Sequence, residues 1–483
     1  MSLIHILLLS LISISIAKER LVFVATHFRH GARAPQGYLD PVNRLDYALE
    51  SWDNPGELTG MGQRMHYLLG LRNRERYITK IYNGFLKEKF DPHEILIYSS
   101  SLNRTLLSAA SQLQGLFPMS EGLGEKLDKE QREKAIPNVD LSSDVKAQMN
   151  TLGDQALPNY MTLAPVRMIS PLEKKIIIYD IPNCLFRRDE MREKNYKTSK
   201  NLNKTVQQFL DDYKAKLEPI YNKYNIKDYD IHFIDNFCDG FIAGSTEGKK
   251  LEPFDGIDVT KQELLDYCYN FSASNFRDWI SGDENRTLAT LEVSKLMRDF
   301  INYMNLRVND DINGTDSSIN KKDYSKPKMM MISGHDSTIS TIEMFFIKVF
   351  FNNNDSYYRY PYFATQVALE VTIDESIGKD DKKRENYNVT FYFDDEPIFS
   401  RKIDDFINAV TPHLWSDDQI DEYCHFVEKK EEEGKGVYFY LTIAFSCTTA
   451  IFLIVMIIMI IKNCRGKTSE SINNSGLLLK NYE

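Results

Sequence analysis

The stretch "FVATHFRHGARAP", residues 23–35, decides the fold of this chain and raises the question of its function. Its first half is a largely apolar run, which is typical of a strand buried in a parallel sheet. Its second half gathers Arg29, His30 and Arg33 within five residues, although the chain has a formal net charge of −10. Cations crowded at the end of a strand indicate either an anion site or a solvated turn.

Two other apolar runs have the same form, HEILIYSSS at residues 93–101 and KPKMMMISG at residues 326–334. Small or polar residues and then a helical pattern follow each of the three runs, at residues 57–77, 102–117 and 336–351. The first helix is indicated by the spacing of its apolar residues Met61, Met65, Leu68, Leu69 and Leu71, and Thr59 is its expected N-cap. Ser101 or Asn103 is expected to cap the second helix. This order of elements predicts an α/β fold, with a mostly parallel sheet and helices on both faces.

The segment from about residue 186 to 300 has a different pattern. Its amphipathic stretches, separated by loops, predict a helical insertion or cap domain. The α/β core would then comprise about residues 18–185 and 301–425. Two later apolar runs, at residues 362–374 and 386–395, predict strands joined as a hairpin.

Both ends of the chain indicate targeting to a membrane. Residues 1–17 form a short apolar segment with a small-x-small ending, which predicts a signal peptide; a buried strand or an uncleaved anchor is the alternative. Residues 437–461 contain no charge over 25 positions, enough for roughly 37 Å of helix. Cations follow directly, so we expect a single transmembrane helix with residues 18–436 outside the cytosol and a cytoplasmic tail at 462–483. A buried core helix is the alternative for this segment.

The cysteines, the glycosylation sequons and the charge balance indicate the compartment of the protein and the classes of partner it can bind. Cys184, Cys238, Cys268 and Cys424 are an even number of cysteines in an oxidising compartment, which allows three pairings. Seven glycosylation sequons are expected to face outward, at Asn103, Asn203, Asn270, Asn285, Asn313, Asn354 and Asn388. An acidic balance without a basic stripe argues against binding to nucleic acid.

Functional side chains follow all three predicted parallel strands. Ligands of open parallel sheets bind beyond the carboxyl ends of the strands. The first strand would deliver Arg29, His30 and Arg33, the second Arg104, and the third His335 with Asp336. Guanidinium groups match phosphoryl oxygens in a bidentate manner, so the three strand ends predict a phosphate site.

The same residues supply a nucleophile. The chain has no P-loop, no G-x-S-x-G elbow, no H-E-x-x-H and no C-x-x-C pair. Arginines beside His30 are expected to lower the pKa of its imidazole, which keeps the ring neutral and nucleophilic. Asp336 is the candidate acid for the departing alcohol, and no metal or other cofactor is expected because the arginines stabilise the charge. His27, His66 and His93 have no partner motif and are expected to have surface or core roles.

These motifs resemble those of the histidine acid phosphatases. "RHGARAP" is similar to the family signature R-H-G-x-R-x-P, and "SGHDST" to its distal H-D motif. "ELTGMGQRMHYLLGLRNRERY" resembles the L-T-x-x-G segment that runs into L-G-x-x-x-R-x-R-Y, and "SSSLNRT" resembles the mid-chain S-S-x-x-x-R-T. The resemblance extends over about residues 20–425, and the ends of the chain resemble the membrane-anchored lysosomal type.

The resemblance implies a role for each motif residue. His30 would form a phosphohistidine, Arg29, Arg33, Arg104 and His335 would hold the phosphate, and Asp336 would be the general acid. The implied protein is an acid phosphatase for phosphate monoesters, anchored as a single-pass type I glycoprotein in the lysosomal or endosomal lumen or at the cell surface. The family's disulfides suggest pairing Cys184 with Cys424, which leaves Cys238 with Cys268.

Two alternatives remain at this level. The H-D form of the distal motif, rather than H-A-E, favours a broad acid phosphatase over an inositol-polyphosphate enzyme, but a phytase-like or lysophospholipid phosphatase is an alternative. An inactive surface-binding protein on the same scaffold is another; the intact set of six site residues argues against it. The oligomeric state is open, and a homodimer is compatible with the sequence.

Overall fold

The computed structural model describes residues 18–36, 52, 54–120, 122–169, scattered positions between 204 and 218, and residues 231–249, 260–281, 283–315 and 327–423. The predicted signal peptide (1–17), transmembrane helix (437–461) and cytoplasmic tail (462–483) lie outside these residues, as do Cys184 and Cys424. Within the described part of the chain, no helix is long and apolar enough to cross a membrane.

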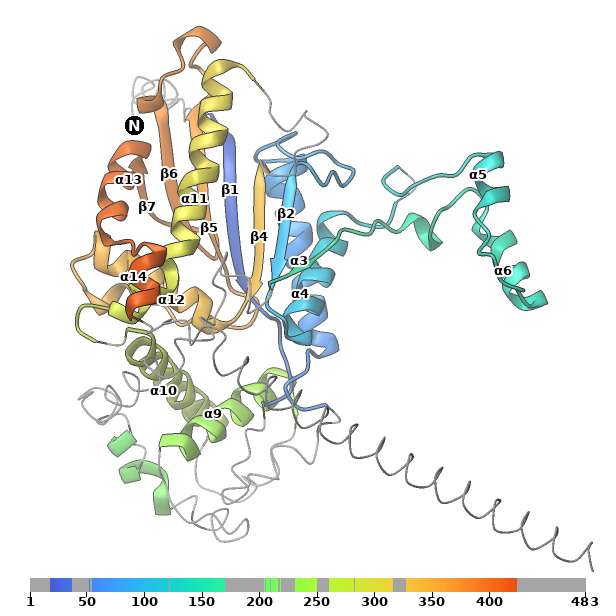
Figure 1. Cartoon of the computed structure of the whole chain (residues 1–483). Coiled ribbons are helices and arrows are strands. Elements are labelled where there is room, and N and C mark those ends of the chain that lie inside the picture. The colour runs from blue at the N-terminus through green and yellow to red at the C-terminus, as the bar shows by residue number, and fades with distance from the viewer. Residues whose placement is uncertain are drawn as a thin grey trace, which may run out of the picture. The chain divides into compact units, whose positions relative to one another are not determined.

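A seven-stranded sheet forms the centre of the fold, in the order β3-β2-β4-β1-β5-β6-β7 (Figure 1). The strands are β1 (Glu19–Arg29), β2 (Ile95–Ser99), β3 (Arg167–Met168), β4 (Met329–Gly334), β5 (Gln366–Asp374), β6 (Tyr387–Phe393) and β7 (Glu396–Lys402). The three predicted parallel strands are β1, β2 and β4, and they pair in parallel as neighbours.

The prediction of a mostly parallel sheet is wrong for the other half. β5 pairs antiparallel with β1, and β6 and β7 continue antiparallel from it. The predicted hairpin of β5 and β6 is confirmed, but β7 was not expected. Asp394 and Asp395 connect β6 to β7 with φ values of 43° and 73°; two such residues make the tight turn that matches the twist of a hairpin. The sheet is therefore mixed.

Helices cover both faces of the sheet, as predicted. In β4, Met329 and Met331 join one apolar cluster, whereas Met330 and Ile332 join another; alternate residues of a strand point to opposite faces. The first cluster packs under α4 (Asn103–Leu116), which lies beside α3 (Gly60–Arg74). The second packs under α11 (Thr287–Asn313), α12 (Asp336–Phe350) and α13 (Ile403–Val410). Further helices are α5 (Lys129–Lys134), α6 (Ser143–Leu152), α14 (Asp417–Tyr423) and the π-helical turn η1 (Glu75–Thr79).

The α3 helix packs through an unexpected face. Thr59 caps it as predicted, since its side chain accepts a hydrogen bond from the Gly62 amide at 3.1 Å. Its apolar residues, however, do not form the buried face, and Leu68 is 54% exposed. The buried positions are Gly62, His66, Gly70 and Asn73. A Cβ at Gly70 would lie 1.9 Å from the carbonyl oxygen of Gln112 in α4, so the two backbones approach too closely for a large side chain.

The α4 helix begins without the predicted cap. Its N-cap residue is Leu102, whose side chain cannot accept a hydrogen bond, instead of Ser101 or Asn103. Thr105 instead donates from its hydroxyl to the carbonyl oxygen of Leu102 at 2.8 Å. The first turn is thus fixed from inside the helix.

The R-x-R-Y segment after α3 forms a buried ionic cluster with β5. Arg76 donates to both carboxylate oxygens of Glu370, at 2.5 and 2.6 Å. The hydroxyls of Tyr77 and Tyr82 donate to the same carboxylate at 2.8 and 2.9 Å. Because Glu370 is fully buried, each of these donors offsets part of the cost of burying its charge. This part of the motif is structural.

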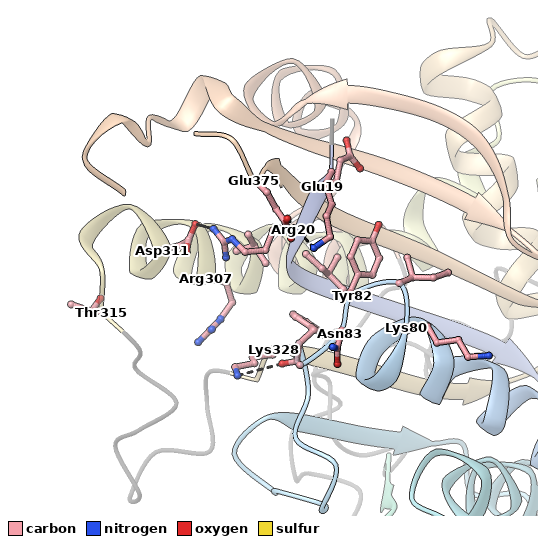
Figure 2. A pocket seen from close by; sticks show the side chains of 16 residues that line it. Glu19, Arg20, Lys80, Tyr82, Asn83, Arg307, Asp311, Thr315, Lys328 and Glu375 are labelled. Carbon is pink, nitrogen blue, oxygen red and sulfur yellow. Dashed lines mark hydrogen bonds and ion pairs between the residues drawn. The ribbon is translucent and has the colours of Figure 1, made fainter. Parts of the chain in front are cut away.

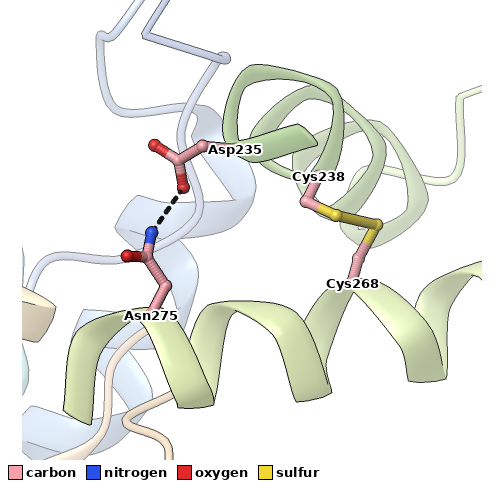
Figure 3. Close-up of a disulfide and its surroundings, with 4 residues drawn as sticks. All are labelled: Asp235, Cys238, Cys268 and Asn275. Carbon is pink, nitrogen blue, oxygen red and sulfur yellow. Dashed lines mark hydrogen bonds between the residues drawn. A yellow bond between two sulfur atoms is a disulfide. The ribbon is translucent and has the colours of Figure 1, made fainter. Parts of the chain in front are cut away.

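The helical insertion contains α9 (Ile231–Thr246) and α10 (Lys261–Ser281), which lie near the carboxyl ends of the parallel strands (Figure 1). A disulfide joins Cys238 of α9 to Cys268 of α10, with the Cα atoms 4.9 Å apart (Figure 3). The next helix, α11, packs against β1 in the core and runs through the expected boundary at residue 300.

Candidate active site

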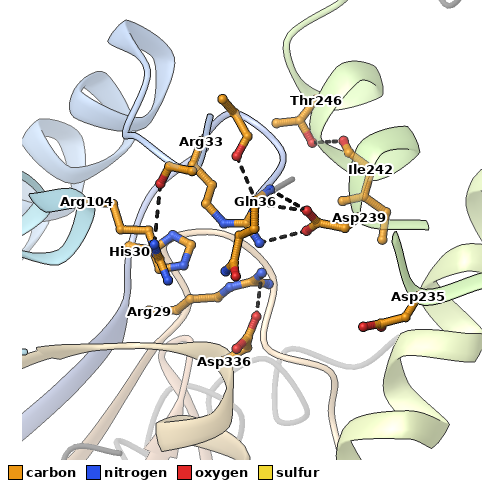
Figure 4. Close-up of polar contacts among 12 residues, drawn as sticks. Arg29, His30, Arg33, Gln36, Arg104, Asp235, Asp239, Ile242, Thr246 and Asp336 are labelled. Carbon is orange, nitrogen blue, oxygen red and sulfur yellow. Dashed lines mark hydrogen bonds and ion pairs between the residues drawn. The ribbon is translucent and has the colours of Figure 1, made fainter. Parts of the chain in front are cut away.

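The sheet order brings the six candidate residues to one place. Because β4 lies between β2 and β1, the carboxyl ends of three strands far apart in sequence are adjacent. Arg29 ends β1, Arg104 is the second residue of α4 after β2, and Asp336 begins α12 after β4. Figure 4 shows Arg29, Arg33, Arg104 and Asp336 gathered around His30.

His30 is buried and has a defined ring orientation. Its Nδ1 lies 2.9 Å from the carbonyl oxygen of Gly31. A carbonyl can only accept, so Nδ1 carries the proton and Nε2 carries the lone pair. Burial, and after it the charges of Arg29 and Arg33, hold the pKa of His30 well below its usual value. The predicted direction is confirmed, but burial contributes more than the arginines.

The loop after His30 needs a glycine. A Cβ at Gly31 would lie 2.4 Å from the carbonyl oxygen of Gly62 at the start of α3. The amide of Gly31 also donates to the hydroxyl of Ser108 in α4, at 3.1 Å. The close packing of this loop between α3 and α4 fixes the backbone next to His30.

Arg29 is held by several partners. Its guanidinium donates to the carbonyl oxygen of Pro361 at 2.6 Å and forms an ion pair with Asp336 at 2.7 Å. The same group lies 4.5 Å from the ring centroid of Phe363, a favourable cation–π distance. Its Nε is buried without a hydrogen-bond partner among the described residues.

Arg33 and Arg104 complete the cationic set. Arg33 makes a bidentate ion pair with Asp239 of α9, at 2.7 and 3.2 Å. With its amide oxygen turned toward the arginines, Gln36 accepts from Nη2 of Arg33 and Nη2 of Arg104, at 3.2 Å each. The Nε of Arg33 is buried without a hydrogen-bond partner in the described part of the chain.

His335 and Asp336 line the same cavity as the arginines. His335 Nε2 is 3.0 Å from the hydroxyl of Ser100, and its ring centroid is 5.6 Å from that of His30. Burial, with the charge of Arg104, lowers the pKa of His335 to about 3. Asp336 Oδ1 accepts from the Ser337 amide at 2.8 Å, which orients the carboxyl group at the amino end of α12.

The three histidines without a partner motif, His27, His66 and His93, have the core or surface roles that were expected. His27 is buried in β1, and His66 lies 3.2 Å from Gln112 inside the α3–α4 layer. His93 contacts Asp91 at 2.9 Å, away from the site.

Asp239 and Gln36 were missed by the sequence analysis. Asp239 is 206 residues from Arg33 and belongs to no motif, so no local signal identifies it. Only the position of α9 over the strand ends reveals it.

A cavity of about 440 Å³ opens over the site. It is lined by Arg29, Arg33, Gln36, Leu102, Arg104, Asp235, Asn236, Asp239, Ile242, Ser272, Asn275, Phe276, Trp279, His335, Asp336, Ser337, Tyr360 and Phe363. Its size suits a small organic ligand. Across the described residues, no group of three or more His, Cys, Asp or Glu side chains could hold a metal ion.

A second cavity of about 340 Å³ lies at the amino end of β1 (Figure 2). Its charges pair within the protein, including Arg20 with Asp311 at 2.6 Å and Lys18 with Glu375 at 3.0 Å. It contains none of the six candidate residues, so the cavity over the strand ends is the candidate active site.

Comparisons with known proteins identify the family of the chain. The family model described as "Histidine phosphatase superfamily (branch 2)" matches residues 43–393. The chain is 24% identical to lysosomal acid phosphatase of Xenopus laevis over 347 residues, which are 71% of this chain and 65% of that protein. It is 37% identical to human prostatic acid phosphatase over 107 residues, 22% of this chain and 25% of that protein. The chain thus aligns with less than two thirds of the length of these relatives.

Solved structures show the same fold. The phytase of Citrobacter braakii superposes with a TM-score of 0.50 at 12% identity, covering 84% of this chain and 99% of the phytase. At that identity the likeness concerns the fold alone.

Proposed function

The chain belongs to branch 2 of the histidine phosphatase superfamily, and on that premise we propose that it hydrolyses phosphate monoesters at acidic pH through a phosphohistidine. The observation that carries the proposal is the buried, neutral ring of His30 with Arg29, Arg33 and Arg104 around it. Such a ring is a nucleophile in a cationic setting. The Nε atoms of Arg29 and Arg33, which have no hydrogen-bond partner among the described residues, suit the oxygens of a phosphoryl group.

The proposed reaction has two steps. Nε2 of His30 attacks phosphorus while the bond from phosphorus to the ester oxygen breaks, and Asp336 gives its proton to the departing alcohol. Water then attacks the phosphohistidine, Asp336 takes a proton from that water, and inorganic phosphate leaves. Arg29, Arg33, Arg104 and His335 hold the phosphoryl oxygens throughout. The low pKa of His30 keeps its ring neutral, and therefore nucleophilic, at acidic pH.

The test is the variant His30→Ala, assayed on p-nitrophenyl phosphate across pH. We expect loss of turnover and of the covalent phosphoenzyme on the chain denatured in alkali, where a phosphohistidine is stable, with an unchanged circular dichroism spectrum. His93→Ala removes a histidine outside the site and serves as the matched control. Full activity of His30→Ala would overturn the proposal.

We also propose that residues 437–461 anchor the enzyme with its catalytic part in a lysosomal or endosomal lumen or at the cell surface. The uncharged run and the cations after it support this, as does the relative named lysosomal acid phosphatase. Alkaline carbonate extraction of membranes from cells that express the chain is the test. Release of the protein into the soluble fraction would contradict the anchor.

A further inference from the structure

The two sides of the candidate active-site cavity differ in charge. Its arginines, Arg29, Arg33 and Arg104, all come from the α/β core. The wall formed by α9 and α10 contributes no Lys or Arg to the described lining; it contributes Asp235, Asn236, Asp239, Ile242, Ser272, Asn275, Phe276 and Trp279. A phosphate on the core side would therefore place its leaving group against an acidic and aromatic wall.

Asp235 and Asp239 have different surroundings on that wall. They lie one helical turn apart in α9, and both line the cavity. Asp239 pairs with Arg33. Asp235 accepts a hydrogen bond from the neutral amide of Asn275, at 3.1 Å (Figure 3). It is exposed, and Figure 4 shows it on α9 apart from the arginines.

Aromatic rings lie on the same wall. Phe276 and Trp279 of α10 meet edge to face, with centroids 5.8 Å apart, and Phe276 also lies 6.1 Å from Tyr360. The faces of such rings attract ammonium groups, and more so next to a carboxylate. A further phosphate on the leaving group would instead meet the carboxylate of Asp235, and like charges repel.

We propose that this wall binds a positively charged leaving group, so that the preferred substrates are phosphate monoesters of amino alcohols, and that Asp235 determines this specificity. The inference rests on the proposed phosphatase function. A polyphosphorylated leaving group would be disfavoured by the carboxylate of Asp235 at the same wall.

The experiment compares the purified full chain with Asp235→Asn on three substrates at one acidic pH and low salt. Phosphocholine has a cationic leaving group, glycerol 2-phosphate a neutral one, and phytate a polyanionic one. We expect Asp235→Asn to lower kcat/KM for phosphocholine roughly tenfold and to change that for glycerol 2-phosphate less than about twofold. Asp266→Asn, which removes an exposed carboxylate of α10 outside the cavity, should change neither.

Each other outcome has a defined meaning. Equal losses on phosphocholine and glycerol 2-phosphate would show that Asp235 has only a structural role, and would overturn the inference. Hydrolysis of phytate by the wild-type chain as efficient as that of phosphocholine would overturn it as well. If the wild-type chain fails on p-nitrophenyl phosphate, the proposed function fails and the inference fails with it. If the wild-type chain hydrolyses p-nitrophenyl phosphate, but Asp235→Asn discriminates between phosphocholine and glycerol 2-phosphate as the wild type does, the specificity proposal alone is overturned.

Discussion

Arg33 and Asp239 join the α/β core to the helical cap through a bidentate ion pair, with nitrogen–oxygen distances of 2.7 and 3.2 Å. Arg33 follows the first strand, whereas Asp239 lies in α9, which a disulfide fastens to α10. The backbone amide of Gln36 also donates to a carboxylate oxygen of Asp239, at 2.8 Å. Burial alone would raise the pKa of Asp239, but the charge of Arg33 holds this pKa below its usual value. The cap thus orients one of the proposed phosphate-binding arginines.

Asp239→Asn should therefore lower kcat/KM for p-nitrophenyl phosphate by roughly 10- to 100-fold, because the guanidinium group of Arg33 loses the carboxylate that orients it. The substitution keeps the shape of the side chain but leaves the buried charge of Arg33 without its carboxylate partner, so the melting temperature should fall as well. Steady-state kinetics of Asp239→Asn and Asp239→Glu, with Asp266→Asn as control, measure the effect. Wild-type kinetics in Asp239→Asn would mean that Arg33 is oriented without α9.

Stability should fall as the pH falls through the range below about 6.5. Burial lowers the pKa of His27 to about 3 and that of His66 to about 4, while the unfolded chain binds these protons near 6.5. Between these values the unfolded state holds more protons, so each such histidine contributes about 1.4 kcal/mol per pH unit to the slope of unfolding free energy. Urea unfolding of wild type and His66→Gln at pH 7, 6 and 5 measures it. An identical slope in both proteins would contradict the low pKa of His66.

Removing one partner of the Arg76–Glu370 ion pair should destabilise the protein more than replacing both partners with apolar residues. Arg76→Met leaves the buried Glu370 carboxylate with only its two tyrosine donors, so we expect a loss of about 3–5 kcal/mol in unfolding free energy. Arg76→Met with Glu370→Leu removes both charges and should recover much of that loss. Denaturant unfolding of the single and double variants is the measurement. A double variant less stable than the single one would contradict this expectation, because the Glu370 carboxylate with its tyrosine hydrogen bonds would then stabilise the fold even without Arg76.

The disulfide of the cap should stabilise the chain. Cys238→Ser with Cys268→Ser opens a loop with a sequence separation of 30 residues, for which loop closure predicts a loss of roughly 3–4 kcal/mol. Thermal unfolding with and without a reductant compares the double variant to wild type. Reduction should lower the melting temperature of wild type more than that of the variant, in which only the predicted Cys184–Cys424 bond is left to reduce. Equal responses would show that the Cys238–Cys268 bond does not form in the purified protein.

The sequence by itself determined which side chains follow the parallel strands. The runs before Arg29, before Arg104 and before His335 are apolar at successive positions, which is typical of strands buried on both faces. Parallel pairing of such strands brings their carboxyl ends to one edge of the sheet. That argument depends on the hydrophobic periodicity within each segment and on the rule that functional side chains of parallel sheets gather at the carboxyl ends of the strands. Neither requires knowledge of contacts between distant segments. The strands β1, β2 and β4 and the gathering of the six candidate residues follow from it.

Only the tertiary structure decided what surrounds those residues. The antiparallel placement of β5 beside β1, the glycine face of α3, and the approach of Asp239 and Asp235 from α9 depend on contacts between segments far apart in sequence. Asp239 meets Arg33 across 206 residues, and neither residue affects the local pattern around the other. Hydrophobic periodicity reports which face of an element is buried, but not which element covers it. For that reason the sequence predicted the cationic phosphate site, whereas the acidic and aromatic wall opposite it emerged only from the fold.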